Sequence, residues 1–196
     1  MTNNILKDVT THIDKSTQYA GLQGPRININ ALYGEEDSTI VLLGVGNILL
    51  TDEGLGIHVV NELRRNYTFT PAITIIDGGT MGMELLSYMR GMKKLLLVDA
   101  ISGEGKPGTI YEFVHDELED YFTEHISVHE VGMQDILRIR AIQEDPLEDA
   151  VVVGVEPETL DVGFEPSSVV QQSLPEVKER VLSVLKSWGV EVKKND

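Results

Sequence analysis

Thr39–Val45 reads Thr-Ile-Val-Leu-Leu-Gly-Val, a short and uninterrupted apolar run that stops at Gly46. An apolar run of this length predicts a strand that is buried on both faces, as in a parallel sheet. Two further short apolar runs predict strands at Ile73–Asp77 and Leu95–Asp99. The segments between the strands, Gly54–Asn66 and Met83–Met92, have apolar residues at helical spacing and are predicted to be helices. This alternation predicts a doubly wound α/β fold.

The second half of the chain adds two strands and two helices. Thr109–Val114 is predicted to run antiparallel, because the segment before it is too short for a parallel crossover, and Val151–Val155 supplies a fifth strand. Ser127–Gln143 begins with the S-x-x-E spacing of a capping box, and Pro175–Trp188 precedes a helix-ending Gly189. The expected fold is a mostly parallel, five-stranded twisted sheet with helices on both faces and one antiparallel strand.

Residues 1–38 differ in composition from the rest of the chain. They are polar and are interrupted by Gly21, Gly24, Pro25 and Gly34. Such a segment is typical of an extension that is partly disordered or lies over a domain. We therefore expect an N-terminal extension over residues 1–38 and a single α/β/α domain over residues 39–196.

Charge and composition exclude several classes of function. The chain has 32 acidic and 16 basic residues and a formal net charge of −16, so neither nucleic acid nor an anionic membrane surface is an expected partner. It has no cysteine, which excludes disulfides, thiolate metal sites and cysteine nucleophiles. The start of the chain lacks the apolar segment of a secretory signal, and no apolar run is long enough to span a membrane. These features predict a cytoplasmic protein.

Three predicted strands are followed by acidic side chains: Glu53 after the first, Asp77 at the end of the second and Asp99 at the end of the third. In open α/β sheets, ligands bind beside the carboxyl ends of the strands. We therefore expect the three carboxylates to converge. Glu53 and Asp77 each have an ordinary alternative role, since an acidic residue at a helix start stabilises the helix dipole and the glycines after Asp77 suit a turn. Asp99 follows four apolar residues, so its carboxylate is expected to be partly buried and to need a partner.

A dinucleotide site is the first alternative for this edge of the sheet. The loop after the first strand reads Gly44-Val45-Gly46-Asn47-Ile48-Leu49, so Leu49 stands where the third glycine of a Rossmann fingerprint is required. Asp52 and Glu53 at the helix start would also repel a pyrophosphate. The loop therefore favours a cation, or a cationic or amide-bearing chain, over a nucleotide.

His129 is a candidate third ligand beside Glu53 and Asp99. It is expected in the first turn of its helix, where the positive helix end opposes protonation and leaves the neutral imidazole that a metal needs. Two carboxylates and one imidazole suit a divalent first-row metal such as nickel or zinc, and a set without thiolate favours reversible binding. A histidine at a helix start also serves as a surface or capping residue. The other four histidines are weaker candidates, including His58, which is expected inside a helix.

Taken together, these segments resemble the motifs of the hydrogenase maturation protease family. The resemblance covers most of the chain from Thr39 and is carried by Gly44–Gly56, by Asp77-Gly78-Gly79-Thr80, by Leu97–Ala100, by Ser127–Glu130 and by Gly154–Glu158. It implies an endopeptidase that removes a short C-terminal peptide from the precursor of the nickel-iron hydrogenase large subunit after nickel insertion. The family's metal-binding residues fall on Glu53, Asp99 and His129, and its aspartate implicated in cleavage falls on Asp77.

The resemblance suggests a mechanism and leaves rivals. No G-x-S-x-G or H-E-x-x-H motif is present, so carboxylate- or metal-assisted attack by water is the expected chemistry. Asp77 would act as base or orient the scissile bond, with Gly78, Gly79 and Thr80 beside the substrate chain, and nickel would be sensed in the substrate. The main alternative is a non-enzymatic nickel-binding chaperone with the same ligands. A nucleotide-binding protein and a peptidase with another substrate are the others.

Overall fold

The computed structural model describes residues 38–89, 91–114, 118 and 147–195. The segments 1–37 and 119–146 lie outside the described residues, and so do the predicted extension and the predicted helix Ser127–Gln143 with His129. The division of the chain at residue 38 therefore stays a prediction. In the part of the chain that is described, no helix is long and apolar enough to cross a membrane.

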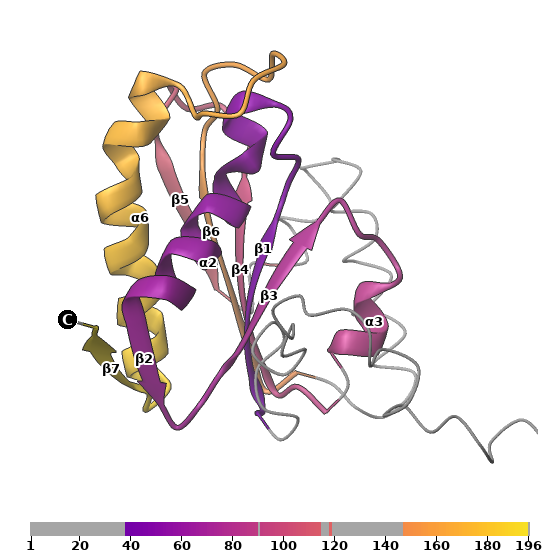
Figure 1. The fold of residues 1–196 in the computed structure, drawn as a ribbon, viewed down its shortest axis with the longest axis vertical. Helices are drawn as coiled ribbons and strands as arrows, with labels where there is room; N and C mark the ends of the chain where they lie inside the picture. Colours follow the sequence, from indigo (N-terminus) through magenta and orange to yellow (C-terminus); the bar gives the residue numbers. More distant parts are fainter. Residues whose placement is uncertain (1–37, 90, 115–117, 119–146, 196) are drawn as a thin grey trace, which may run out of the picture.

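A five-stranded sheet forms the centre of the molecule (Figure 1). Its strands are β1 (Ile40–Val45), β3 (Thr74–Gly79), β4 (Lys94–Ala100), β5 (Ile110–Val114) and β6 (Asp149–Val155). The order across the sheet is β3-β1-β4-β6-β5. The pairings among β3, β1, β4 and β6 are parallel, and β5 pairs with β6 in the antiparallel sense. The predicted fold class and the antiparallel strand are confirmed.

Helices cover both faces of this sheet. The helices α2 (Leu55–Asn66) and α6 (Ser168–Ser187) pack on one face, where their apolar side chains meet Leu42 and Val153. The short helix α3 (Leu85–Tyr88) packs on the other face against Leu43 and Leu97. Alternate residues of each strand therefore belong to different cores, as a strand buried on both faces requires.

Two predicted helices have different bounds in the structure. α3 is shorter than the predicted Met83–Met92, because the chain before it forms three-residue turns and Gly91 adopts a φ of 73°. α6 begins seven residues before the predicted start at Pro175, since Ser167 Oγ accepts a hydrogen bond from Val170 N (3.3 Å) and Val170 is buried. Pro175, the predicted start of this helix, lies inside it.

The C-terminal end of α6 agrees with the prediction. Gly189 has a φ of 87°, its N–H donates to Lys186 O (3.0 Å), and Val190 N–H donates to Leu185 O (3.0 Å). This pair of bonds is a Schellman motif. It turns the chain into β7 (Glu191–Lys194), which pairs with β2 (Tyr67–Thr70) in a small antiparallel sheet that sequence patterning did not predict.

Candidate active site at the carboxyl edge of the sheet

The loop after β1 brings Glu53 to the carboxyl edge of the sheet. Gly46 has a φ of 129°, and a Cβ placed on it would lie 1.8 Å from the carbonyl oxygen of Glu53. Only glycine allows this approach. The loop then forms the 3-10 helix η1 (Thr51–Gly54), which leads directly into α2.

α2 starts in close contact with two neighbouring strands. A Cβ on Gly56 would lie 2.2 Å from Val98 O and 2.4 Å from Val45 O, so the first turn of α2 rests on the backbones of β1 and β4. Val45 is the last residue of β1, and Val98 directly precedes Asp99 in β4. Glu53 and Asp99 therefore belong to the same edge of the sheet, as the sequence predicted.

Both of these carboxylates have buried oxygens. Asp99 is only 2% exposed, and its Oδ1 accepts a hydrogen bond from Ala100 N (2.8 Å). The Oε2 atom of Glu53 is also inaccessible to solvent. Carboxylate oxygens held in this way are suitable donors to a divalent cation. Because His129 lies outside the described residues, the predicted three-residue site stays a prediction.

Asp77 lies at the same edge but points to the other face of the sheet from Asp99. Side chains two residues apart on a strand point to the same face of the sheet. Asp77 therefore shares a face with Ile75, which packs against α2, whereas Asp99 shares a face with Leu97, which packs in the core beneath α3. The three carboxylates thus share an edge but do not form one cluster. The expectation of a single crevice was drawn from strand ends alone and did not consider the alternation of side chains along a strand.

A hydrogen-bonded chain from α2 orients the Asp77 carboxylate. Arg64 Nη2 donates to Ile75 O (2.7 Å), Arg64 Nη1 donates to Asn61 Oδ1 (3.0 Å), and Asn61 Nδ2 donates to Asp77 Oδ2 (2.9 Å). The arginine fixes which end of the Asn61 amide faces the aspartate. Asp77 is therefore a positioned acceptor whose other oxygen can serve a substrate or a water molecule.

The residues after Asp77 form a turn that suits an approaching chain. Gly78 is buried, Gly79 is partly buried with a φ of 50°, and Thr80 is exposed. Met81 N donates to Gly78 O (2.9 Å) and Gly46 N donates to Gly79 O (2.9 Å), which ties this turn to the end of β1. The arrangement fits both an ordinary strand-ending turn and the predicted substrate contact.

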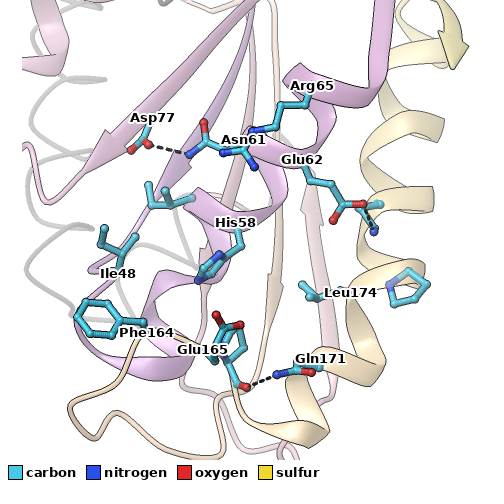
Figure 2. A pocket seen from close by; sticks show the side chains of 14 residues that line it. Ile48, His58, Asn61, Glu62, Arg65, Asp77, Phe164, Glu165, Gln171 and Leu174 are labelled. Atoms are coloured by element: carbon cyan, nitrogen blue, oxygen red, sulfur yellow. Dashed lines mark hydrogen bonds and ion pairs between the residues drawn. The ribbon is translucent and has the colours of Figure 1, made fainter. Parts of the chain in front are cut away.

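Asp77 also lines a cleft of about 730 Å³ between α2, α6 and the segment before α6. Figure 2 shows Asp77 and Asn61 at one end of this cleft, and Ile48, Phe164 and His58 further along it. The lining mixes apolar side chains with the Glu62–Lys178 ion pair and with Glu165. A cleft of this mixed character suits a polypeptide segment better than a small apolar ligand.

His58 was assigned a weak role from sequence, but it lies in this cleft. Its Nε2 atom is buried and has no hydrogen-bond partner among the residues that the structure describes. The spacing His58, Asn61, Arg65 is that of one helical face, and all three residues line the cleft. That periodicity was the sequence signal that could have identified them.

Asp52 was predicted only as one of two acidic residues at the helix start, yet it organises the edge. It is fully buried, and its carboxylate accepts three backbone hydrogen bonds, from Ser167 N (2.6 Å), Glu158 N (2.8 Å) and Thr159 N (3.1 Å). It thereby joins the loop after β1 to the loop after β6 and to the start of α6. Asp52 is a structural residue of the site.

A second network holds the loop between β4 and β5. The Tyr111 hydroxyl donates to Glu156 Oε2 (2.6 Å), which also accepts from Gly103 N (2.8 Å), and Gly105 N donates to the Tyr111 oxygen (2.8 Å). Burial of the phenol and its bond to the Glu156 carboxylate raise the pKa of Tyr111 above its ordinary value of 10.0. Glu156 belongs to the Gly154–Glu158 motif, and here it fixes a loop.

The sequence profile of the hydrogenase maturation proteases matches residues 57–184. The chain is also 38% identical over 153 residues to the hydrogenase 2 maturation protease of Escherichia coli K12, an alignment that covers 78% of this chain and 93% of that protein. The chain belongs to the hydrogenase maturation protease family. The predicted resemblance is confirmed, and membership makes the chain a peptide hydrolase.

Further relatives and solved structures resemble the chain over most of its length. The hydrogenase expression/formation protein HoxM of Cupriavidus necator is 31% identical over 153 residues, covering 76% of this chain and 75% of that protein. The solved structure of the hydrogenase maturating endopeptidase HybD from Escherichia coli superimposes with a TM-score of 0.76 at 36% identity, covering 80% of this chain and 97% of that one. The fold is also shared with the solved structure of a [NiFe] hydrogenase maturation protease from Thermococcus kodakarensis, with a TM-score of 0.64 at 24% identity, covering 74% of this chain and 98% of that one.

Proposed function

We propose that this protease removes the C-terminal peptide from the nickel-loaded precursor of the [NiFe]-hydrogenase large subunit and so completes its maturation. The observation that carries the proposal is the Asp77 carboxylate, which is held by Asn61 in a cleft at the edge where Glu53 and Asp99 also lie. Family membership supplies the class of reaction. The reaction is proposed to take place in the cytoplasm, without nucleic acid or a membrane surface as partner.

Nickel enters this proposal as part of the substrate. Glu53 and Asp99, together with His129, would engage the nickel ion of the precursor, since carboxylate and imidazole donors suit such an ion and no thiolate competes for it. A substrate without the ion would lose these contacts. Binding would then favour the metal-loaded precursor, and cleavage would follow metal insertion.

Cleavage itself requires a base and a held peptide. In the proposed reaction Asp77 accepts a proton from the attacking water, the water oxygen bonds to the scissile carbonyl carbon, the C–N bond breaks, and the proton passes to the leaving amine. Asn61 keeps the carboxylate in place for this transfer. Gly78, Gly79 and Thr80 would lie beside the substrate backbone, where the small residues permit close approach.

The direct test is to incubate the protein with nickel-loaded and nickel-free precursor and to follow the mass of the large subunit. The proposal expects loss of the C-terminal peptide from the nickel-loaded form alone. Equal processing of both forms would contradict nickel sensing, and processing of neither would contradict the proposed substrate.

Two controls separate the roles. His129→Ala should reduce processing of the loaded precursor, and an unchanged rate would remove His129 from the site. The alternative of a non-enzymatic nickel-binding chaperone predicts binding to the precursor with no change in its mass. Asp77→Asn distinguishes them further, because it should abolish processing while leaving a chaperone's binding intact.

A further inference from the structure

Five apolar side chains are exposed on two loops at the carboxyl edge of the sheet. Three are more than half exposed, with Val162 at 87%, Phe164 at 69% and Leu49 at 53%, and the other two are Ile48 and Leu160. A single exposed apolar residue is ordinary on a protein surface, but a group of them marks an interaction site. We call these five residues the apolar rim.

The two loops are joined along their backbones. Gly163 N donates to Leu49 O (2.9 Å), Thr51 N donates to Gly163 O (2.9 Å), and Leu50 and Gly163 form a parallel bridge. Thr51 Oγ1 adds a bond to Thr159 O (2.8 Å). Together with the three bonds to Asp52, these contacts set the apolar rim in place before a partner binds, so little ordering entropy is lost on association.

The apolar rim lies between the two parts of the candidate site. Its first loop leads directly into η1 and Glu53, at the end of the molecule where β1 and α2 meet in Figure 1. Ile48 and Phe164 also line the cleft that contains Asp77, as Figure 2 shows. A polypeptide seated on the rim would therefore lie beside the mouth of the cleft, within reach of it for a terminal segment.

Acidic side chains border the apolar rim. Glu158, Asp161 and Glu165 are exposed and belong to the same loop as Leu160, Val162 and Phe164. A second copy of this chain bound through the same surface would place these carboxylates against their own copies, because a two-fold interface pairs a surface with itself. A partner with basic residues around an apolar area would instead be attracted.

We propose that the apolar rim is the docking surface for the body of the polypeptide substrate. The occupant is the metal-loaded precursor of the proposed function, and it presents to the rim an apolar area bordered by lysine or arginine side chains. The rim would hold the precursor while its C-terminal segment enters the cleft toward Asp77. This inference rests on the proposed function and adds to it the surface that selects a whole protein over a free peptide.

The test compares the double variant Leu49→Ser/Val162→Ser, with one change in each loop, with the control Val114→Ser. Val114 is 45% exposed and lies at the end of β5, away from both loops. The affinity of each full-length protein for nickel-loaded precursor is measured by titration at low and at high salt, with the processing rate at saturation. The rim variant should bind at least about tenfold more weakly, with an unchanged saturated rate, and the control should bind like the unaltered protein.

Three results would overturn the inference. The rim variant could bind the precursor as tightly as the unaltered protein does, or the rim variant and the control could lose the same amount of affinity. The third is a rim variant that differs from the unaltered protein only in self-association, as measured by sedimentation. A thermal unfolding midpoint that stays within about 2 °C of the unaltered protein shows that the double variant is folded. Should the rim substitutions unfold the chain, Asp161→Asn provides a second measurement, since it should reduce the salt dependence of binding without removing apolar area. If the unaltered protein does not process the precursor at all, the proposed function fails, which is a separate outcome.

Discussion

At the residue scale, Asp52 shows how a charged side chain at an active-site edge can serve the structure. Its carboxylate accepts three backbone N–H groups in a fully buried position. Asp52→Asn replaces one acceptor oxygen with a donor that faces these N–H groups, and should lower the free energy of unfolding by about 2–4 kcal/mol. Chemical denaturation measures this loss. The exposed Asp161→Asn is the matched control and should change the free energy by less than about 0.5 kcal/mol.

The pair formed by Asn61 and Asp77 allows a sharper test of the proposed base. Asn61→Asp replaces the amide with a second carboxylate at the position now 2.9 Å from Asp77. Two carboxylates this close are both ionised only at higher pH, because their like charges repel each other. The acid limb of the pH–rate profile should therefore move to higher pH. Asn61→Ala should lower the rate and move that limb much less, because it removes one hydrogen bond without adding a charge. A profile with an unmoved acid limb in Asn61→Asp would argue against Asp77 as the base.

At the element scale, the strands of the central sheet were predictable, and two helix bounds and the small β2–β7 sheet were not. The parallel strands were found because they are apolar runs that are buried on both faces over most of their length. The start of α6 was predicted seven residues late, at Pro175, because the actual cap at Ser167 depends on a hydrogen bond to Asp52 in a distant loop. The pairing of β2 with β7 joins segments that are far apart in the sequence, and local patterns carry no information about it.

The contact between α2 and the sheet predicts a strong effect at one glycine. A Cβ on Gly56 would meet two backbone carbonyls, which cannot rotate away as a side chain can. Gly56→Ala should therefore cost about 3 kcal/mol of folding free energy and displace the start of α2 together with Glu53. At Gly82 a Cβ would meet nothing within 4 Å, so Gly82→Ala is the control and should be nearly neutral. Equal stabilities of the two variants would contradict this close packing.

The Tyr111 network should be visible in the alkaline stability of the protein. Burial and the bond to Glu156 raise the pKa of Tyr111 in the folded state, so the folded protein holds this proton more tightly than the unfolded chain. The resulting stabilisation is complete below about pH 10 and is lost as the pH rises through the folded-state pKa. Tyr111→Phe should therefore show a shallower fall in unfolding midpoint above pH 10. Tyr88→Phe, at an exposed tyrosine, should retain the steep fall of the unaltered protein.

At the scale of the whole molecule, the sequence predicted the edge of the sheet at which the candidate site residues lie. It did not predict that these residues are divided between the two faces of the sheet. Parallel strands place their carboxyl ends at one edge, and this rule correctly placed Glu53, Asp77 and Asp99 at that edge, while their roles stay predictions. The separation of Asp77 from Asp99 follows from the two cores on either side of the sheet. The cleft and the apolar rim arise from loops and helices that meet only in the folded chain, so patterns within a single segment did not reveal them.

The net charge of the chain predicts that added salt changes the stability of the protein and its binding to the precursor in opposite directions. The formal charge of −16 causes self-repulsion in the folded state, and salt screens it, with a Debye length of about 10 Å at 0.1 M and about 3 Å at 1 M. Raising the sodium chloride concentration from about 0.05 M to about 0.5 M should therefore raise the thermal unfolding midpoint, by an amount that scanning calorimetry measures. The same change should weaken precursor binding, because salt also screens the attraction between the acidic border of the apolar rim and basic groups of the precursor. Asp161→Asn should flatten the salt dependence of binding while leaving that of the midpoint nearly unchanged, because one of many charges contributes little to the total repulsion. If both quantities rose together with salt, apolar contact alone would account for docking, and the acidic border would have no part in it.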